Sequence, residues 1–283
     1  MPSRILDSHI HLWPDPHTST PTSSYAWMQP DHFLAKRHEI SEYLAVATPA
    51  PTGFVYVETD RYLPSPTPNI HENNSEEENK EKLETWAKEP LEEILFLKRV
   101  LQGENGDLMK GVVLWAPFNI PPTQFQTYLS IAKDVAGSEL WNRVVGFRFL
   151  LQGKKEGEVS TLVTSENWLA NIVSLAQGRN GKGWTFDVGV DVHRDGEQGL
   201  EAVVDMIRAV REKEEGSGAN VRFILSKSQP PLPFTQTQSN ADLARQIISA
   251  NPRFPNLTRQ SAMSMPCTAS HPIPTPSSNS PAR

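Results

Sequence analysis

The sequence predicts an α/β protein, a TIM-barrel-like (β/α)8 fold that is incomplete, with about six strand–helix units. Three observations support this class. Apolar, β-branched segments alternate with segments of helical period along most of the chain. The strand segments are almost continuously apolar, which is typical of a parallel sheet covered by helices. No Gly-x-Gly-x-x-Gly follows the first strand, so a dinucleotide-binding fold has no support.

Length and composition limit the class of protein. The chain has 283 residues, enough for one large barrel domain or for two small domains. Its net charge of −6 argues against a nucleic-acid surface, and its one cysteine, Cys267, fits a reducing compartment. There is no signal core and no apolar run of roughly 20 residues. We therefore expect a cytoplasmic protein with a small-molecule substrate and no nucleic-acid or membrane partner; a homo-oligomer is left open.

The amino-terminal third contains two expected strands. Residues 5–13 pass from a short apolar run into an alternating apolar and polar stretch, and residues 53–60 are β-branched and aromatic. A helix is expected between them, at about 31–47. Residues 63–82 are rich in Pro, Asn and Glu, with the run Glu76-Glu77-Glu78 near the centre. This composition predicts a flexible, solvated acidic insertion.

After the insertion, helices and strands alternate regularly. A helix is expected at about 82–101, where Leu91, Ile94, Leu95 and Leu97 form an apolar stripe. The next expected strands are 109–116, 144–151, 184–192 and 221–225, and the helices are about 121–136, 165–177, 197–214 and 240–250. Residues 259–283 are Ser- and Pro-rich, which predicts a disordered tail after a barrel domain at 1–258.

Two histidines of the first strand are candidates for metal binding. His9 and His11 are two residues apart, so on a strand they share one face with Asp7. Two converging imidazole nitrogens can bind one divalent metal ion; zinc is the first expectation, with manganese or no metal as alternatives. Taken alone, two histidines near a surface loop are equally compatible with no metal role.

The fifth expected strand adds further candidates. One of its faces carries Asp187, Asp191 and His193, and the other carries valines that suit a helix-covered side. The acidic face is therefore expected to point into the barrel. His193 is a third candidate metal ligand, with a solvated loop histidine as the alternative. Asp191 is a candidate catalytic carboxylate, or an acceptor that orients a histidine.

An arginine and a glutamate at strand ends complete the candidate site. Arg148 lies within the fourth strand, where a guanidinium needs a partner. Its partner could be Glu58, a substrate carboxylate or a developing oxyanion, and a structural Arg–Asp pair is the alternative. Glu58 is a candidate catalytic acid or base, a metal ligand, or simply the partner of Arg148. Trp13 is a candidate for substrate binding, and Trp27 could also line the pocket, although aromatic residues at strand ends often serve packing alone.

Together these motifs resemble the amidohydrolase-related family, in its lactonase-like, fungal-type branch, over roughly residues 4–225. The motifs are Asp7-Ser8-His9-Ile10-His11-Leu12-Trp13, Tyr56-Val57-Glu58-Thr59-Asp60-Arg61, Gly146-Phe147-Arg148-Phe149-Leu150-Leu151-Gln152 and Phe186-Asp187-Val188. The resemblance implies a (β/α) barrel and hydrolysis of a lactone or, more broadly, of a C–O or C–N bond in a small molecule. Some members of the family bind one divalent metal ion and others bind none.

The resemblance also assigns individual residues. His9 and His11 match the His-x-His of the family's first strand, His193 its fifth-strand histidine, and Arg148 the arginine of its Gly-x-Arg motif. The carboxyl end departs from the pattern. The sixth strand runs into Ser226 without the usual histidine, and no aspartate of a last strand follows.

Three functions are compatible with these observations. The first is a metal-assisted hydrolase that uses the residues named above. The second is a metal-independent lactonase, in which His9 and His11 bind the substrate. The third is a truncated, catalytically inactive relative, because loss of the last-strand aspartate would remove a proton acceptor that typically contributes ~10²–10⁴-fold in rate.

Overall fold

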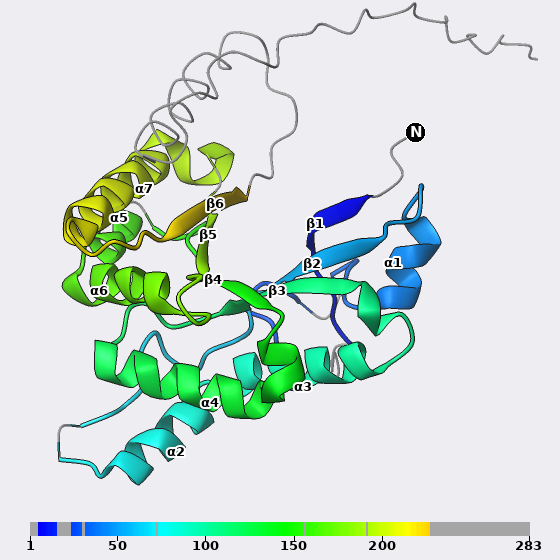
Figure 1. Ribbon diagram of the computed structural model, residues 1–283, viewed down its shortest axis with the longest axis horizontal. Coiled ribbons are helices and arrows are strands. Elements are labelled where there is room, and N and C mark those ends of the chain that lie inside the picture. Colours follow the sequence, from blue (N-terminus) through cyan, green and yellow to red (C-terminus); the bar gives the residue numbers. More distant parts are fainter. Residues whose placement is uncertain are drawn as a thin grey trace, which may run out of the picture.

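The structure is a computed structural model that describes residues 5–15, 24–29, 32–71, 73–155, 157–190 and 192–226. It contains one parallel sheet of six strands in the order β1-β2-β3-β4-β5-β6, each paired with its neighbours in the sequence. The sheet curls into half a barrel, with β1 and β6 at the two open ends of the curve (Figure 1). The α/β class and the parallel sheet are therefore confirmed, and the curvature is compatible with an incomplete (β/α) barrel.

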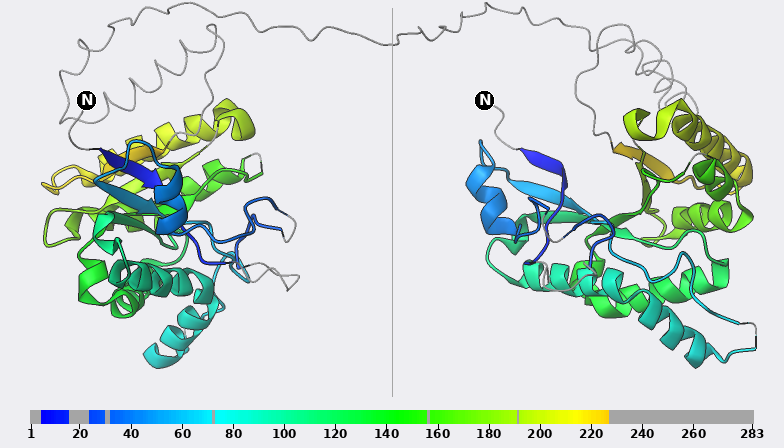
Figure 2. Two further views of the ribbon diagram at one scale, coloured as in Figure 1. Left: turned by 90° about the vertical axis from the view of Figure 1, so that its right-hand side faces the viewer. Right: turned by 180° about the vertical axis from the view of Figure 1, so that it is seen from behind.

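The strands follow the expected order but are mostly shorter than expected. Their bounds are β1 Leu6–Ile10, β2 Gly53–Val57, β3 Met109–Trp115, β4 Val144–Leu150, β5 Thr185–Gly189 and β6 Arg222–Ser226. The helices are α1 Ile40–Val46, α2 Glu76–Trp86, α3 Lys88–Gln102, α4 Pro122–Trp141, α5 Glu158–Val163, α6 Glu166–Ser174 and α7 Val192–Glu214, with short 3-10 turns η1 Gly106–Leu108 and η2 Leu175–Gln177. They cover the convex side of the sheet, as the views from the side and from behind show (Figure 2).

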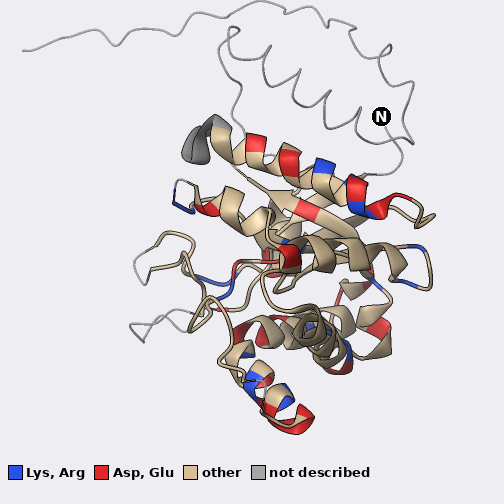
Figure 3. Ribbon diagram, turned by 90° about the vertical axis from the view of Figure 1, so that its left-hand side faces the viewer, with Lys and Arg blue, Asp and Glu red and all other residues tan. Residues whose placement is uncertain are grey.

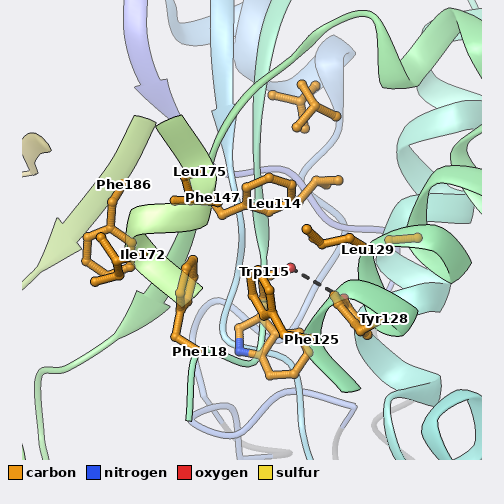
Figure 4. Close-up of a cluster of buried hydrophobic side chains, with 14 of the residues drawn as sticks. Leu114, Trp115, Phe118, Phe125, Tyr128, Leu129, Phe147, Ile172, Leu175 and Phe186 are labelled. Carbon is orange, nitrogen blue, oxygen red and sulfur yellow. Dashed lines mark hydrogen bonds between the residues drawn. The ribbon is translucent and has the colours of Figure 1, made fainter. Parts of the chain in front are cut away.

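The hydrophobic core lies between the convex face of the sheet and these helices. Strand side chains on this face are fully buried, for example Phe54, Phe147 and Phe186. Aromatic rings interlock there: Phe118 lies 4.9 Å from Phe186 between ring centroids. Tyr128 of α4 donates a hydrogen bond to the backbone oxygen of Trp115 at 3.3 Å (Figure 4). The core therefore fixes the strands from outside and leaves their concave face available for a site.

The first expected helix, at about 31–47, is wrong over residues 32–39. Helix α1 begins at Ile40 and not near residue 31. The reason is that His38 pairs with Trp13 through two backbone hydrogen bonds, Trp13 N to His38 O at 2.8 Å and His38 N to Trp13 O at 3.0 Å. An extended residue that bonds across to another segment cannot continue a helix.

The expectation that the acidic run at 76–78 belongs to a flexible insertion is also wrong. Glu76, Glu77 and Glu78 form the first turn of α2. The Ser75 side chain accepts from the Glu78 backbone at 3.2 Å, and the Glu78 carboxylate accepts from the Ser75 backbone at 2.8 Å. This capping box, together with acidic residues at a helix amino terminus, stabilises helical structure at that point. Acidic and basic residues occur together on the exposed faces of α2 and α7 (Figure 3).

Two element boundaries in the second half also differ. Strand β5 ends at Gly189 and α7 begins at Val192, so the expected strand at 184–192 is too long at its carboxyl end. Helix α4 changes direction at Gly137, whose φ of 70° is not helical, one residue after the expected helix end. The expected helix at 240–250, the Ser- and Pro-rich tail and the end of the barrel domain at residue 258 lie outside the described residues.

Candidate functional site

A cavity of about 410 Å³ lies at the carboxyl ends of the strands. It opens over β1, β2 and β4, and four of the predicted site residues line it: His11, Trp13, Glu58 and Arg148. The remaining lining residues are Ala26, Trp27, Leu34, Thr59, Asp60, Leu150, Gln152 and Gly153. The carboxyl ends of parallel strands are where sites form in this class of fold, because the loops after the strands meet there.

His9 and His11 point toward one another. Their Nε2 atoms are 3.0 Å apart and their rings meet edge to face. The Nδ1 atom of His11 lies 2.8 Å from the backbone oxygen of Val57, which is a hydrogen bond in which Nδ1–H is the donor. With its proton at Nδ1, His11 accepts the His9 Nε2–H at Nε2, and the same Nε2 lone pair could instead bind a metal ion or take up a proton.

The surroundings of both histidines favour the neutral form of the imidazole ring. Burial, with Arg148 as the next cause, lowers the pKa of His9. The same two causes, in the same order, lower the pKa of His11 to about 4. A neutral imidazole is the form that binds a metal ion or accepts a proton.

Asp7 does not share the face of the two histidines. The pairing between β1 and β2 shifts register between Asp7 and Ile10. The Asp7 carboxylate accepts a hydrogen bond from the hydroxyl of Tyr43 at 3.0 Å, and Tyr43 belongs to α1 on the convex side. The expectation that Asp7, His9 and His11 share one face is therefore wrong, because a bulge reverses the alternation of side chains.

Arg148 sits between two carboxylates on the concave face. Its Nε atom lies 3.2 Å from Glu58 Oε1 and 3.8 Å from Asp187 Oδ1. All three side chains are at least nine-tenths buried. The register brings Arg148 of β4 opposite Asp187 of β5, so the sheet itself aligns this pair. Both sequence alternatives for Arg148, a Glu58 partner and an Arg–Asp pair, are present together.

Glu58 has a second, local hydrogen bond. Its Oε2 accepts from the backbone N–H of Asp60 at 2.6 Å, and Asp60 adopts a left-handed φ of 53°. Burial raises the pKa of Glu58 to about 8, and this effect outweighs the attraction of Arg148. A carboxyl group with a pKa near neutrality is suited to transfer protons.

Aromatic residues form one wall of the cavity. Trp13 is 7% exposed, and its ring centroid lies 5.8 Å from that of Trp27. The indole nitrogen of Trp13 donates to the backbone oxygen of Lys36 at 2.9 Å, and that of Trp27 donates to the backbone oxygen of Thr59 at 2.8 Å. Both indoles are therefore held in place while they line the pocket.

Three of the predicted site residues do not line the pocket. His9 contacts the cavity residue His11 and is not itself part of the cavity wall. Asp191 lies outside the described residues, and its catalytic role stays a prediction. His193 falls within helix α7 and not on a strand, and its side chain is outside the described part of the chain. Among the side chains that are described, no group of three or more His, Cys, Asp and Glu could hold a metal ion.

The two histidines fit a metal ion as a pair of ligands. Two nitrogens bound to one zinc ion in tetrahedral geometry are about 3.3 Å apart, close to the 3.0 Å between the Nε2 atoms here. The backbone bond to His11 Nδ1 is the outer contact that metal-bound histidines usually make. A third protein ligand would have to come from residues outside the described set, such as His193 or Asp191.

Sequence reasoning gave no role to several residues that shape this site. Asp187 was placed on the correct face by alternation but was given no function. Leu34 and Gln152 line the cavity from loops. Gln152 lies four residues beyond Arg148, so the alternation of β4 places it on the same inward face; no periodicity marks Leu34.

None of the described helices is both long enough and apolar enough to cross a membrane. No family model, no curated protein and no solved structure matches this chain. The site geometry and the motifs are therefore the observations from which a function can be argued.

Proposed function

We propose that the protein is a hydrolase of the amidohydrolase-related type, with lactonase-like activity on a small molecule and one divalent metal ion as cofactor. The observation that carries this proposal is the convergence of the His9 and His11 Nε2 atoms, 3.0 Å apart, beside a cavity that Arg148 also lines. The curled parallel sheet supports it, because an incomplete (β/α)8 barrel would present its site at this edge.

His9 and His11 would hold the metal ion, with zinc favoured over manganese for two imidazole ligands. When bound, such an ion supplies Lewis-acid chemistry, either by lowering the pKa of water or by polarising a carbonyl group. The Val57 backbone oxygen fixes the His11 ring, so the ligand nitrogen is oriented before any ion arrives. His193 and Asp191 remain candidates for further ligands.

Arg148 would bind the polar end of the substrate. Its Nη1 atom is buried without a hydrogen-bond partner among the described residues, while its Nε faces Glu58. An unused, buried N–H at a cavity wall can bind a carboxylate or the oxygen that gains charge when a carbonyl is attacked. Trp13 and Trp27 would bind the apolar body of the substrate.

Glu58 would exchange the proton that hydrolysis requires. Because its pKa is about 8, Glu58 holds a proton at neutral pH and can give it up at little cost in free energy. Arg148, at 3.2 Å, stabilises the ionised form after release. Asp191 is the second candidate for this role.

The test combines metal content with turnover. Purified protein is analysed for bound zinc and manganese, and a panel of sugar lactones and aromatic lactones is assayed with and without added Zn²⁺. We expect zinc to bind and at least one lactone to be hydrolysed, with loss of both in His9→Gln and His11→Gln. His71→Gln, which alters an exposed histidine, is the matched control. A folded protein that neither binds zinc nor turns over any lactone contradicts the proposal and favours an inactive relative.

A metal-independent lactonase is the second candidate, and one observation favours it. Arg148 lies close enough to lower the pKa of both histidines, and a cation so placed also opposes a metal ion. In that case His9 and His11 would bind the substrate directly. Lactone hydrolysis that persists at full rate after chelation, and that requires Arg148 and His11, would select this alternative.

A further inference from the structure

We propose that Glu93, on the outer helix α3, is a positioning residue for the pocket: it holds Thr59 and, through it, Trp27 in place. Glu93 does not line the cavity and the proposed reaction makes no use of it. Its influence on substrate binding rests on the proposed function, whereas its influence on the geometry of the pocket does not.

Burial makes Glu93 unusual for its position. It is 2% exposed on a helix whose buried face is otherwise apolar. A carboxylate removed from water is costly unless hydrogen bonds compensate it. Packing alone would favour a hydrophobic side chain at this position of the helix. The presence of a carboxylate therefore indicates that specific hydrogen-bond partners compensate its burial.

Those partners lie at the carboxyl end of β2. Glu93 Oε1 accepts a hydrogen bond from the hydroxyl of Tyr56 at 2.7 Å and from the backbone N–H of Thr59 at 3.0 Å. It also accepts one from the hydroxyl of Thr59. Hydrogen bonds to an ionised acceptor are stronger than neutral ones, so Thr59 is held at two points by one charge.

Thr59 connects Glu93 to the cavity. Its backbone oxygen accepts the indole N–H of Trp27 at 2.8 Å, and both Thr59 and Trp27 line the pocket. Thr59 also directly follows Glu58, whose carboxylate bonds to the Asp60 backbone and faces Arg148. Movement of Thr59 would therefore shift the aromatic wall and the carboxylate together.

A second connection leads to the first strand. The Tyr56 hydroxyl that donates to Glu93 also lies 3.4 Å from the backbone oxygen of Leu12. Leu12 lies between His11 and Trp13, which both line the cavity. The carboxylate thus ties α3 to two chain segments that form the site.

The test measures hydrogen exchange at indole N–H groups by NMR. Loss of the Glu93 bonds should loosen Thr59 and speed exchange of the Trp27 indole proton about tenfold or more, since bonds to a charged group contribute on the order of 1.5–3 kcal/mol. The indole protons of Trp86 and Trp168, which donate to the backbone oxygen of Ser65 and to the sulfur of Met206, serve as internal references, because neither bond belongs to the Glu93 network. Trp27→Phe assigns the resonance.

The variants separate positioning from general destabilisation. Glu93→Leu removes all three bonds, and Glu93→Gln keeps an acceptor oxygen in the same place. Glu92→Gln, an exposed neighbour with the same change of charge, is the matched control. We expect faster exchange of Trp27 alone in Glu93→Leu, restoration close to wild type in Glu93→Gln, and no change in Glu92→Gln. If Glu93→Leu does not fold, Glu93→Asp takes its place.

Either of two results would overturn the inference. One is an unchanged Trp27 exchange rate in Glu93→Leu; the other is an equal acceleration of all three indoles, which would show loss of global stability only. Where a lactone is hydrolysed, Glu93→Leu should raise KM more than it lowers kcat, and Glu93→Gln should restore KM. Because the exchange measurement needs no substrate, an absence of turnover would count against the proposed function and leave the result for Glu93 unaffected.

Discussion

Arg148 Nε lies 3.2 Å from Glu58 Oε1, although the two residues come from different strands, β4 and the end of β2. Asp187 approaches the same Nε from β5 at 3.8 Å. One buried cation thus holds the ends of three strands on the concave face. In a sheet that is open at both edges among the described residues, such a link stabilises the curvature as well as the site.

Removal of the buried cation should be strongly destabilising. Arg148→Met removes the buried cation that lies beside Glu58 and Asp187, which we expect to lower the free energy of unfolding by about 3–5 kcal/mol. Urea unfolding measures the change. Arg208→Met, which breaks an exposed pair with Asp205, is the control and should change stability by about 0.5 kcal/mol or less. The double variant Arg148→Met with Glu58→Gln should recover part of the lost free energy of unfolding. If the effects of the two substitutions simply add, Arg148 and Glu58 are not energetically coupled.

Stability should fall as pH rises through the neutral range because of Glu58. Burial raises its pKa from 4.5 to about 8, so the native state binds a proton that the unfolded state has released. The free energy of unfolding therefore decreases with rising pH up to about 8. Urea midpoints measured between about pH 7.5 and 8.5 test this, because His11 is deprotonated there in both the native and the unfolded state. Glu58→Gln should flatten the slope; an unchanged slope would contradict the assignment.

His11 should make the free energy of unfolding decrease as pH falls, which is the opposite of the effect of Glu58. Burial and Arg148 lower its pKa from 6.5 to about 4, so the native state binds fewer protons than the unfolded state. Its contribution to stability is present above the ordinary pKa and is lost as pH falls toward about 4. His11→Gln should reduce the acid sensitivity of the urea midpoint, and His71→Gln should leave it unchanged. Equal sensitivity in the wild type and His11→Gln would exclude this effect.

Zinc should stabilise the folded protein if the histidine pair binds it. At free Zn²⁺ about 100 times Kd, the expected gain in the free energy of unfolding is about 2.7 kcal/mol, which thermal unfolding records as a higher Tm. His9→Gln and His11→Gln should each abolish most of the shift, because each removes one of two converging ligands. A shift of the same size in both variants would place the bound zinc elsewhere.

Gly146 should not tolerate a side chain. A Cβ at this position would lie 2.0 Å from Thr185 Oγ1 and 2.6 Å from the Thr185 backbone oxygen. Gly146→Ala must push β4 from β5 beside Arg148, and we expect a loss of about 1–3 kcal/mol in urea unfolding. Gly103→Ala, where the nearest atom to a new Cβ is 3.4 Å away, should be nearly neutral. Comparable losses in the two variants would show that steric crowding is not the cause.

Much of the fold followed from short-range patterns. Continuous apolar segments located all six described strands in the right order, because a strand buried on the convex face needs apolar residues whatever its neighbours are. Alternation placed Arg148 and Asp187 on the same face of β4 and β5, and spacing brought His9 and His11 together. These features depend on periods of two residues, which a sequence displays directly.

The sequence by itself therefore determined the parallel α/β architecture, the histidine pair and the inward arginine. Only the tertiary structure decided that Asp7 turns toward α1, that His38 pairs with Trp13 and delays the start of the expected helix to Ile40, and that Glu93 reaches Thr59. The physical reason is distance along the chain. A bulge, a bridge between loops and a buried carboxylate bond each depend on a partner far away in sequence, and no local period records such a partner.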